Sequence, residues 1–492
     1  MSTYHYVACD LGAESGRVVL GTLSDGRVAI EEIHRFPTGA ISIGGSLRWD
    51  LLRSFDELKT GLRKVAARGL PIASVSTDSW GVDYVFLHGR EPMLGLPYHY
   101  RDARLDGSME KAFAKVPADK IFAESGIQFM QLNTLYQLLT DLEQRPKLLK
   151  LVEKFLTIGD YFNYLFSGAK KVEVSLASTT QLYDPRKRKW SRELIKSFGL
   201  PAKIFPEIVP SGAKLGPLLP EIASETGLQG VEVVASCSHD TGAAVAAVPG
   251  EGDDWAYLSS GTWSLLGIES EKPIITDKSR AYNFTNEVGY DHTIRFLKNI
   301  IGLWVVQECR RAWANAGQEY SYDQLTKLAD EAPPLKRFIN PAAARFAKPG
   351  GMPEKIAGYC RETGQTPPES VGATVRCVLE SLALLYDRTL REIATVTGQK
   401  IARLHIVGGG SKNTLLNQLS ANATQVPVHT GTVEATAIGN ILIQALGLGH
   451  LPSLAAARDV VRQSFPVSIH RPQDAGVWQD AKERFGRLTL AT

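Results

Sequence analysis

Short apolar runs separated by polar turns open the chain. Residues 4–9 (YHYVAC), 17–23 (RVVLGTL), 28–36 (VAIEEIHRF) and 72–77 (IASVST) are predicted strands, and residues 50–67 carry apolar side chains at helical spacing. The order is strand, strand, strand, helix, strand, and the first three strands are close enough to form a meander. A βαβ dinucleotide-binding unit does not begin in this way.

The order of predicted elements in the N-terminal region recurs in the second half of the chain, although the amino-acid sequences differ. Residues 231–236 form a predicted strand before a helix, and residues 255–269 read as two strands around a glycine turn. We interpret this as an imperfect internal duplication. The chain is therefore expected to be an α/β protein of two domains, with boundaries at 1–245 and 246–492.

Two further stretches complete the pattern. Residues 100–230 are mostly helical and are expected to form an insertion in the first domain that covers the substrate. A long helix is predicted over residues 368–396, and a strand at 404–407 runs directly into three glycines.

Composition excludes several classes of protein. The chain has 492 residues, of which 44% are hydrophobic and 22% are charged, with a net charge of +3. That charge is too mild to indicate a nucleic-acid partner, and the short basic stretches KKVEV (170–174) and RKRKW (186–190) are expected to be solvated loops. No apolar run approaches the ~20 residues of a membrane span, and the N-terminus lacks the features of a signal peptide. These features predict a cytoplasmic protein with no membrane partner.

Five cysteines are present, and none forms a CxxC pair, which argues against a zinc site. Cys360 and Cys377 could approach each other in the fold. Two reduced thiols are the favoured interpretation in a cytosolic enzyme, but a disulfide is left open. The oligomeric state, monomer or homodimer, is also left open.

Glycine turns between predicted strands point to phosphate binding. In DLGAESGR (10–17), a tight turn exposes backbone N–H groups, glycine lets phosphate oxygens approach, and Asp10 could hold Mg²⁺ through water. A plain hairpin explains this motif about as well. SSGT (259–262) offers a second such turn. GGG (408–410) follows a strand, but it lacks the spacing of a Rossmann loop.

Asp240 is the candidate general base. It lies in SHDT (238–241) at the predicted start of a helix, where an aspartate could equally be an N-cap. Phosphoryl transfer needs alignment, Mg²⁺ and a carboxylate at the nucleophile, and a cap and a base are compatible at a helix N-terminus. A second motif, TDSWGVD (77–83), offers an aromatic side chain, a glycine and two carboxylates, which are groups that can bind a sugar.

Together these motifs resemble the FGGY carbohydrate kinases of the actin and Hsp70 superfamily, and most specifically the rhamnulokinase branch. The resemblance covers residues 5 to about 445, and the segments most specific to that branch are TDSWGVD, GIQFMQLNTLYQL, SSGTWSLLG and LKNIIGLWVVQ. It implies two actin-like (ribonuclease H-like) domains, a sugar-binding one followed by a nucleotide-binding one. It further implies ATP- and Mg²⁺-dependent phosphorylation of L-rhamnulose to L-rhamnulose 1-phosphate in rhamnose breakdown.

The resemblance also implies roles for individual residues. Asp10 would help to hold Mg²⁺, and Asp240 would be the base. The residues implied to contact ATP are Ala13, Glu14, Ser15, Gly16, Arg17, Thr262, Asn299, Gln307 and Gly409. Those implied to bind the sugar are Gly81, His239, Asp240 and Thr241.

Two departures and three alternatives accompany this reading. Glu14 places a carboxylate in the phosphate loop where a small polar residue is more usual, and the tetrapeptide that names the family is absent. A kinase of another ketose such as L-fuculose remains open, because a few pocket side chains decide substrate choice. A non-catalytic actin-like ATPase would not need the sugar motifs. An oxidoreductase is suggested only by the glycines, whose spacing argues against it.

Overall fold

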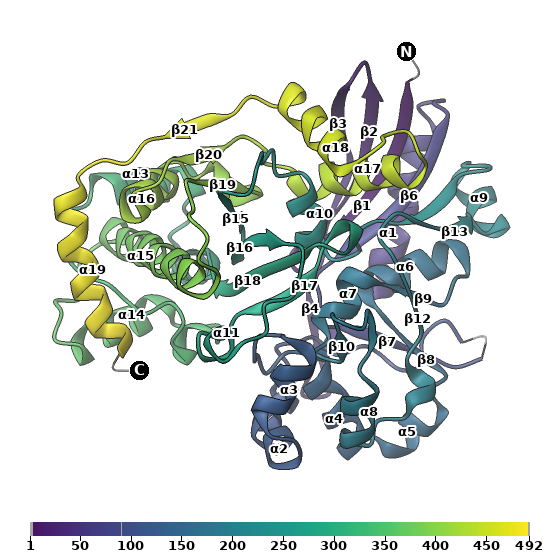
Figure 1. The fold of residues 1–492 in the computed structure, drawn as a ribbon, viewed down its shortest axis with the longest axis horizontal. Coiled ribbons are helices and arrows are strands. Elements are labelled where there is room, and N and C mark those ends of the chain that lie inside the picture. Colours follow the sequence, from purple (N-terminus) through teal and green to yellow (C-terminus); the bar gives the residue numbers. More distant parts are fainter. Residues whose placement is uncertain (1–2, 90, 491–492) are drawn as a thin grey trace. The chain divides into compact units, whose positions relative to one another are not determined.

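A computed structural model describes residues 3–89 and 91–490, which form two compact units (Figure 1). The first unit comprises Met1–Pro249, Glu269–Phe296 and Glu434–Ser464, and the second comprises Gly250–Ile268, Leu297–Val433 and Phe465–Thr492. The chain thus leaves the first unit after Pro249 and returns to it twice. The contiguous division at residue 245 stays a prediction for the two functional domains.

A mixed sheet forms the centre of the first unit, in the strand order β13–β14–β6–β1–β2–β3. The strands are β1 (Tyr4–Leu11), β2 (Ser15–Ser24), β3 (Arg27–Pro37), β6 (Ile72–Ser79), β13 (Ala213–Pro217) and β14 (Glu232–Ala235). β1 pairs antiparallel with β2 and parallel with β6, and this register places Asp10 beside both Arg17 and Asp78. The predicted meander and the strand after it are confirmed.

Helices cover both faces of this sheet. α1 (Leu51–Ala66) approaches so closely that a Cβ on Gly61 would overlap Val18 of β2, and α17 (Ala435–Gly447) approaches Gly21 of β2 in the same way through Ile441. Successive residues of a strand point to opposite faces, so residues 18 and 21 lie on opposite sides. α6 (Ile158–Ser167) packs against β6 and β14.

The remaining elements of the first unit lie mainly in the helical insertion, which has its own apolar core. Its helices are α2 (Ser108–Lys115), α3 (Ala118–Ser125), α4 (Thr134–Gln144), α5 (Pro146–Leu151), α7 (Val174–Thr179), α8 (Arg192–Phe198) and α9 (Pro220–Thr226), and α10 (Asp240–Ala246), α11 (Asp277–Ala281) and α18 (Leu454–Ser464) belong to the same unit. The short strands of the first unit, inside and outside the insertion, are β4 (Ala40–Ile43), β5 (Ser46–Trp49), β7 (Tyr84–Leu87), β8 (Lys154–Thr157), β9 (Lys171–Glu173), β10 (Tyr183–Asp184), β11 (Lys189–Trp190), β12 (Glu207–Val209) and β17 (Thr285–Val288).

One of the two basic stretches is not the predicted loop. KKVEV forms strand β9 and the start of α7, and Val172 and Glu173 are fully buried. The prediction was wrong because it weighed the two lysines and not the apolar alternation that follows them. In the second stretch, RKRKW, residues 186–188 form the predicted exposed turn, whereas Lys189–Trp190 form strand β11.

The second unit repeats the pairing of the first. β15 (Trp255–Ser260) pairs antiparallel with β16 (Trp263–Ser270) and parallel with β19 (Arg403–Val407), as β1 does with β2 and β6. Here the strand order is β18–β16–β15–β19–β20–β21, with β18 (Ile294–Ile301), β20 (Val428–Thr430) and β21 (Ser468–His470). The last two residues of β16 and the first three of β18, which include Arg295, belong to the first unit. The helices are α12 (Trp304–Asn315), α13 (Tyr322–Glu331), α14 (Met352–Glu362), α15 (Val371–Thr397), α16 (Thr414–Thr424) and α19 (Ala475–Leu490).

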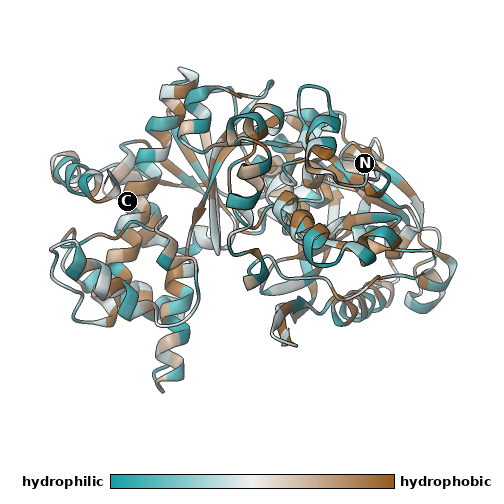
Figure 2. Cartoon of the chain, turned by 90° about the horizontal axis from the view of Figure 1, so that it is seen from below, coloured by the Kyte–Doolittle hydropathy of each residue, from teal (hydrophilic) through white to brown (hydrophobic). Residues whose placement is uncertain are grey.

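This repeated pairing supports the predicted duplication, and α15 is the predicted long helix. Brown and teal segments alternate along most helices in Figure 2, as expected where one face of a helix is buried. Within the part of the chain that the structure describes, no helix is long and apolar enough to cross a membrane. All five cysteines are buried and free, and Cys360 and Cys377 share a hydrogen bond.

Candidate active site

The turn between β1 and β2 forms the first part of the site. Gly12 N donates to Ser15 O at 2.9 Å, and Thr38 closes the turn from β3 through its N–H to Glu14 O at 3.2 Å. Gly16 has no room for a side chain, because a Cβ there would overlap the Phe36 ring. Glu14 is exposed at the tip. The implied ATP contacts Ala13, Glu14, Ser15, Gly16 and Arg17 therefore lie together on one tight hairpin.

Arg17 is held by two carboxylates in this structure. Its guanidinium forms ion pairs with Asp10 beside it on β1 and with Glu434 at the N-cap position of α17. Despite burial, which opposes the charge, these two carboxylates raise the pKa of Arg17 above its usual value. The sequence reasoning missed Glu434, whose only local signal is a carboxylate just before a helix. The implied contact of Arg17 with a phosphate would require it to exchange these partners.

A third carboxylate, Asp78, lies beside Asp10 at the end of β6. It is fully buried and accepts a hydrogen bond from Asn440 Nδ2 at 2.6 Å. Burial and the charges of Asp10 and Asp240 raise its pKa well above the usual range. Three carboxyl groups therefore gather where β1 and β6 end and α10 begins, and the raised pKa of Asp78 means that this cluster disfavours full ionisation unless a cation is present.

This region could bind magnesium only through one or two carboxylates together with waters and phosphates, and not in a site made of protein ligands alone. Among the described residues, no group of three or more histidines, cysteines or carboxylates could enclose a metal ion. Mg²⁺ in kinases is commonly bound by one or two carboxylates together with waters and substrate phosphates. Asp10 offers such a carboxylate, so the donor set is compatible with an ion that is bound mainly by the nucleotide.

Asp240 stands at the first position of α10, with His239 at the N-cap position. The interpretation of Asp240 as the N-cap is therefore corrected by one residue. Its Oδ1 accepts hydrogen bonds from Thr241 N at 2.5 Å and Thr241 Oγ1 at 3.1 Å. Burial and the Asp10 charge raise its pKa, although His239 and Thr241 oppose the rise. The side chain stays 30% exposed, and Thr241 engages only Oδ1.

Residues at the start of α7 hold the backbone of the loop that carries Asp240. Glu173, fully buried at the N-cap position of α7, accepts hydrogen bonds from Ser238 N at 3.0 Å and from Ser175 N at 2.9 Å. Ser175 Oγ in turn accepts a hydrogen bond from His239 N at 3.0 Å. Burial raises the pKa of Glu173. A residue that the sequence assigned to a loop therefore fixes the backbone of the SHDT motif.

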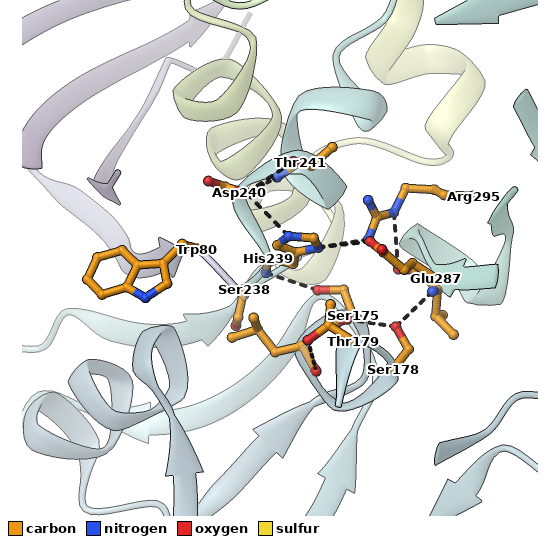
Figure 3. A network of polar contacts seen from close by, with 12 residues as sticks. Trp80, Ser175, Ser178, Thr179, Ser238, His239, Asp240, Thr241, Glu287 and Arg295 are labelled. Carbon is orange, nitrogen blue, oxygen red and sulfur yellow. Dashed lines mark hydrogen bonds and ion pairs between the residues drawn. The ribbon is translucent and has the colours of Figure 1, made fainter. Parts of the chain in front are cut away.

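Two buried charges lie behind His239, as Figure 3 shows. Its Nδ1 lies 3.0 Å from Arg295 Nη2 and 3.4 Å from Glu287 Oε2, while its Nε2 lies 3.4 Å from Asp240 Oδ1. Arg295 comes from β18 and Glu287 from β17. Neither residue was among the candidates, because no local motif marks them and only the pairing of distant strands brings them to His239.

TDSWGVD forms the wall beside this loop. A Cβ on Gly81 would stand only 3.4 Å from His239 Nε2, which confirms that these two predicted sugar-binding residues lie together. Trp80 packs on Trp49 with ring centroids 4.0 Å apart. Asp83 is fully buried and accepts hydrogen bonds from both indoles. The Asp83 carboxylate therefore holds the two tryptophans together from inside and does not reach outward.

Val82 adopts a φ of +71° in the same turn. A β-branched residue in that conformation is strained, and such strain persists only where surrounding contacts impose it. Here the Val82 carbonyl accepts hydrogen bonds from Thr134 Oγ1 at 2.6 Å and Gln137 Nε2 at 3.3 Å. Both donors come from α4, so the insertion determines the shape of the wall.

In the second unit, the implied nucleotide contacts fall in two neighbouring places. Thr262 forms the turn between β15 and β16, and its carbonyl accepts hydrogen bonds from Gly302 N and Trp304 N, just before Gln307 of α12. Gly409 is exposed, with open space where a Cβ would be. Its neighbour Gly410 packs directly on Ser260. Asn299 lies partly exposed on β18.

Comparisons with known proteins agree with this arrangement. Residues 5–247 match the N-terminal domain of the FGGY family of carbohydrate kinases, and residues 256–448 match the C-terminal domain of that family. A rhamnulokinase from Bacteroides thetaiotaomicron is 42% identical over 481 residues, which is 98% of each chain. One from Enterococcus faecalis is 41% identical over 95% of this chain and 94% of its own.

Solved structures show the same fold at low sequence identity. Xylulose kinase from Lactobacillus acidophilus superposes with a TM-score of 0.82 at 16% identity, covering 99% of this chain and 98% of its own. Plasmodium falciparum glycerol kinase with ADP gives a TM-score of 0.79 at 14% identity, over 100% and 98% of the two chains. The predicted fold class is confirmed. Since family models match both halves of the chain and relatives align over nearly all of it, the chain belongs to the FGGY family of carbohydrate kinases.

Proposed function

We propose that this carbohydrate kinase transfers the γ-phosphoryl group of ATP to L-rhamnulose, giving L-rhamnulose 1-phosphate, as a step of rhamnose breakdown. The substrate is supported by relatives that are 39–42% identical along almost the whole chain and are named rhamnulokinases. We place the reaction in the cytoplasm, where ATP is available and buried thiols stay reduced.

The arrangement of Asp240 carries the chemical part of this proposal. Thr241 donates to Oδ1 from its backbone N–H and its hydroxyl, so Oδ2 is the oxygen proposed to accept the proton of an attacking sugar hydroxyl. The raised pKa brings the base closer to neutral pH, where a general base works best. Gly81, His239 and Thr241 would line the sugar around this carboxylate.

The residues proposed to contact ATP are Ala13, Glu14, Ser15, Gly16, Arg17, Thr262, Asn299, Gln307 and Gly409. Mg²⁺, when bound with ATP, would offset charge on the transferring phosphoryl group. Asp10 is the residue proposed to hold it, and Arg17 would have to exchange its ion pairs with both Asp10 and Glu434 to reach a phosphate.

ADP release with Mg²⁺-ATP and a panel of ketoses and glycerol tests the proposal. L-Rhamnulose should be the preferred acceptor over L-fuculose, L-ribulose, L-xylulose, D-xylulose and D-fructose. Preference for another ketose would keep the kinase and overturn the substrate. Silence across the panel would instead favour an ATPase without sugar chemistry.

Asp240→Asn tests the base directly. The exchange keeps the volume and the Thr241 hydrogen bonds but removes the basic oxygen, so kcat should fall by about 10²–10⁴-fold while both substrates still bind. Asp277→Asn is the matched control, because Asp277 also occupies the first position of a helix but is 96% exposed. Near wild-type turnover in Asp240→Asn would refute the assignment.

A further inference from the structure

A hydrogen bond from Arg295 determines which ring nitrogen of His239 carries the proton. Arg295 is fully buried, and its Nη2 lies 3.0 Å from His239 Nδ1. A guanidinium has only donors, so Nδ1 must be the acceptor in this hydrogen bond. In a neutral imidazole the single proton is then on Nε2.

This tautomer matters because Nε2 faces the base. His239 Nε2 lies 3.4 Å from Asp240 Oδ1, the oxygen that already accepts both hydrogen bonds from Thr241. With the proton on Nε2, the ring places a positive N–H dipole beside Oδ1, at 3.4 Å. With the proton on Nδ1, the bond to Arg295 would be lost and a bare nitrogen would face a carboxylate.

We infer that Arg295 is a positioning residue, which selects the Nε2–H tautomer of His239 and thereby turns Oδ2 of Asp240 towards the sugar. The inference rests on the proposed role of Asp240 as base. It adds to that role a reason why one carboxylate oxygen, and not the other, receives the proton.

Glu287 makes this arrangement possible. Its Oε2 lies 3.1 Å from Arg295 Nη2, and its side chain is only 5% exposed, so it compensates a cation that water cannot reach. It also lies 3.4 Å from His239 Nδ1. Glu287 would therefore accept a hydrogen bond from Nδ1–H if Arg295 were absent, which gives the alternative tautomer a defined partner.

Long-range ¹⁵N–¹H spectra of the imidazole rings test the tautomer without any substrate. The chain has ten histidines, and loss of one signal in His239→Gln assigns the ring. The wild-type protein should show a protonated Nε2 and a bare Nδ1. In Arg295→Met the proton should move to Nδ1, facing Glu287. A wild-type ring protonated on Nδ1 would overturn the inference, whatever the substrate of the enzyme proves to be.

Kinetics separate positioning from general stability. Arg295→Met should lower kcat by about ten- to a hundredfold, as expected for a misplaced reacting group, with a smaller change in the KM for ATP. Arg295→Lys retains a cationic donor and should recover part of the loss. Arg376→Met is the control, since it removes a largely buried arginine from an ion pair with Glu380 within α15; it should leave kcat unchanged.

A second variant protects the test against misfolding of Arg295→Met. Glu287→Gln keeps the volume and leaves Arg295 as the donor to Nδ1, so the Nε2–H tautomer should persist. A proton on Nδ1 in Glu287→Gln would show that Glu287, and not Arg295, determines which nitrogen of His239 is protonated. Wild-type kcat in a folded Arg295→Met would equally refute the positioning role.

Discussion

Asp83 allows the energetics of the sugar-side wall to be tested. Its carboxylate is fully buried and accepts hydrogen bonds from Trp49 Nε1 at 2.6 Å, Trp80 Nε1 at 3.1 Å and Gln137 Nε2 at 2.8 Å. Burial raises the pKa of Asp83 to about 6, against an ordinary value of 3.8, although these N–H donors favour the ionised form and oppose the rise.

The sign of the resulting pH dependence follows directly. The folded protein keeps a proton on Asp83 up to about pH 6, whereas the unfolded chain releases it near pH 3.8. Between these values folding takes up a proton, so the free energy of unfolding falls by about 1.4 kcal/mol per pH unit, or about 3 kcal/mol in all. This contribution is complete below pH 3.8 and is lost as the pH rises through 6.

Urea unfolding of the wild type and Asp83→Asn between pH 4 and 7.5, followed by tryptophan fluorescence, isolates this contribution. Other buried carboxylates titrate in both proteins and cancel in the difference. The unfolding free energy of Asp83→Asn, relative to wild type, should rise by about 3 kcal/mol across the range. Asp277→Asn measures the background of removing an exposed aspartate.

Two results would refute the reasoning for Asp83. A difference that stays flat with pH would mean that burial and the N–H donors offset each other. A difference that falls as pH rises would mean that the donors outweigh burial, and that the ionised Asp83 stabilises the wall.

Two further predictions concern the nucleotide side. Gly410→Ala should destabilise the second unit by about 1–3 kcal/mol, because a Cβ would overlap Ser260, and a lower melting temperature in calorimetry would show it; an unchanged melting temperature would mean that the turn yields easily. Arg17→Ala and Thr262→Val should each raise the KM for ATP about tenfold, the value of one charge-assisted hydrogen bond, with little change for the sugar; an effect confined to sugar affinity would contradict the assignment.

Much of the fold could be predicted because its signals are local. The alternation of apolar residues located β1, β2, β3 and β6, and helical spacing located α1 and α15. Short glycine motifs located the turns between strands. The recurrence of strand, turn and strand in each half was visible as a pattern before the matching strand pairings were known. The return of residues 434–464 to the first unit was not visible, since no local signal records which sheet a helix joins.

The candidate site likewise contains residues that a local motif reveals and residues that only the fold brings into place. The local motif SHDT revealed Asp240 and His239, and TDSWGVD revealed Gly81, because chemistry that acts through neighbouring residues leaves a compact sequence signature. Glu434 and Arg295 left none. They reach Arg17 and His239 only after strands and helices that are far apart in sequence have paired.

This division has a physical reason. A motif determines which groups are present, but the proton placement and charge of those groups depend on what surrounds them in a medium of low dielectric. Asp240 carries two equivalent oxygens in the sequence, and His239 two nitrogens. The hydrogen bonds from Thr241 and Arg295 make each pair inequivalent. The sequence therefore identifies Asp240 as the proposed base, whereas the fold determines which of its oxygens is already engaged by Thr241.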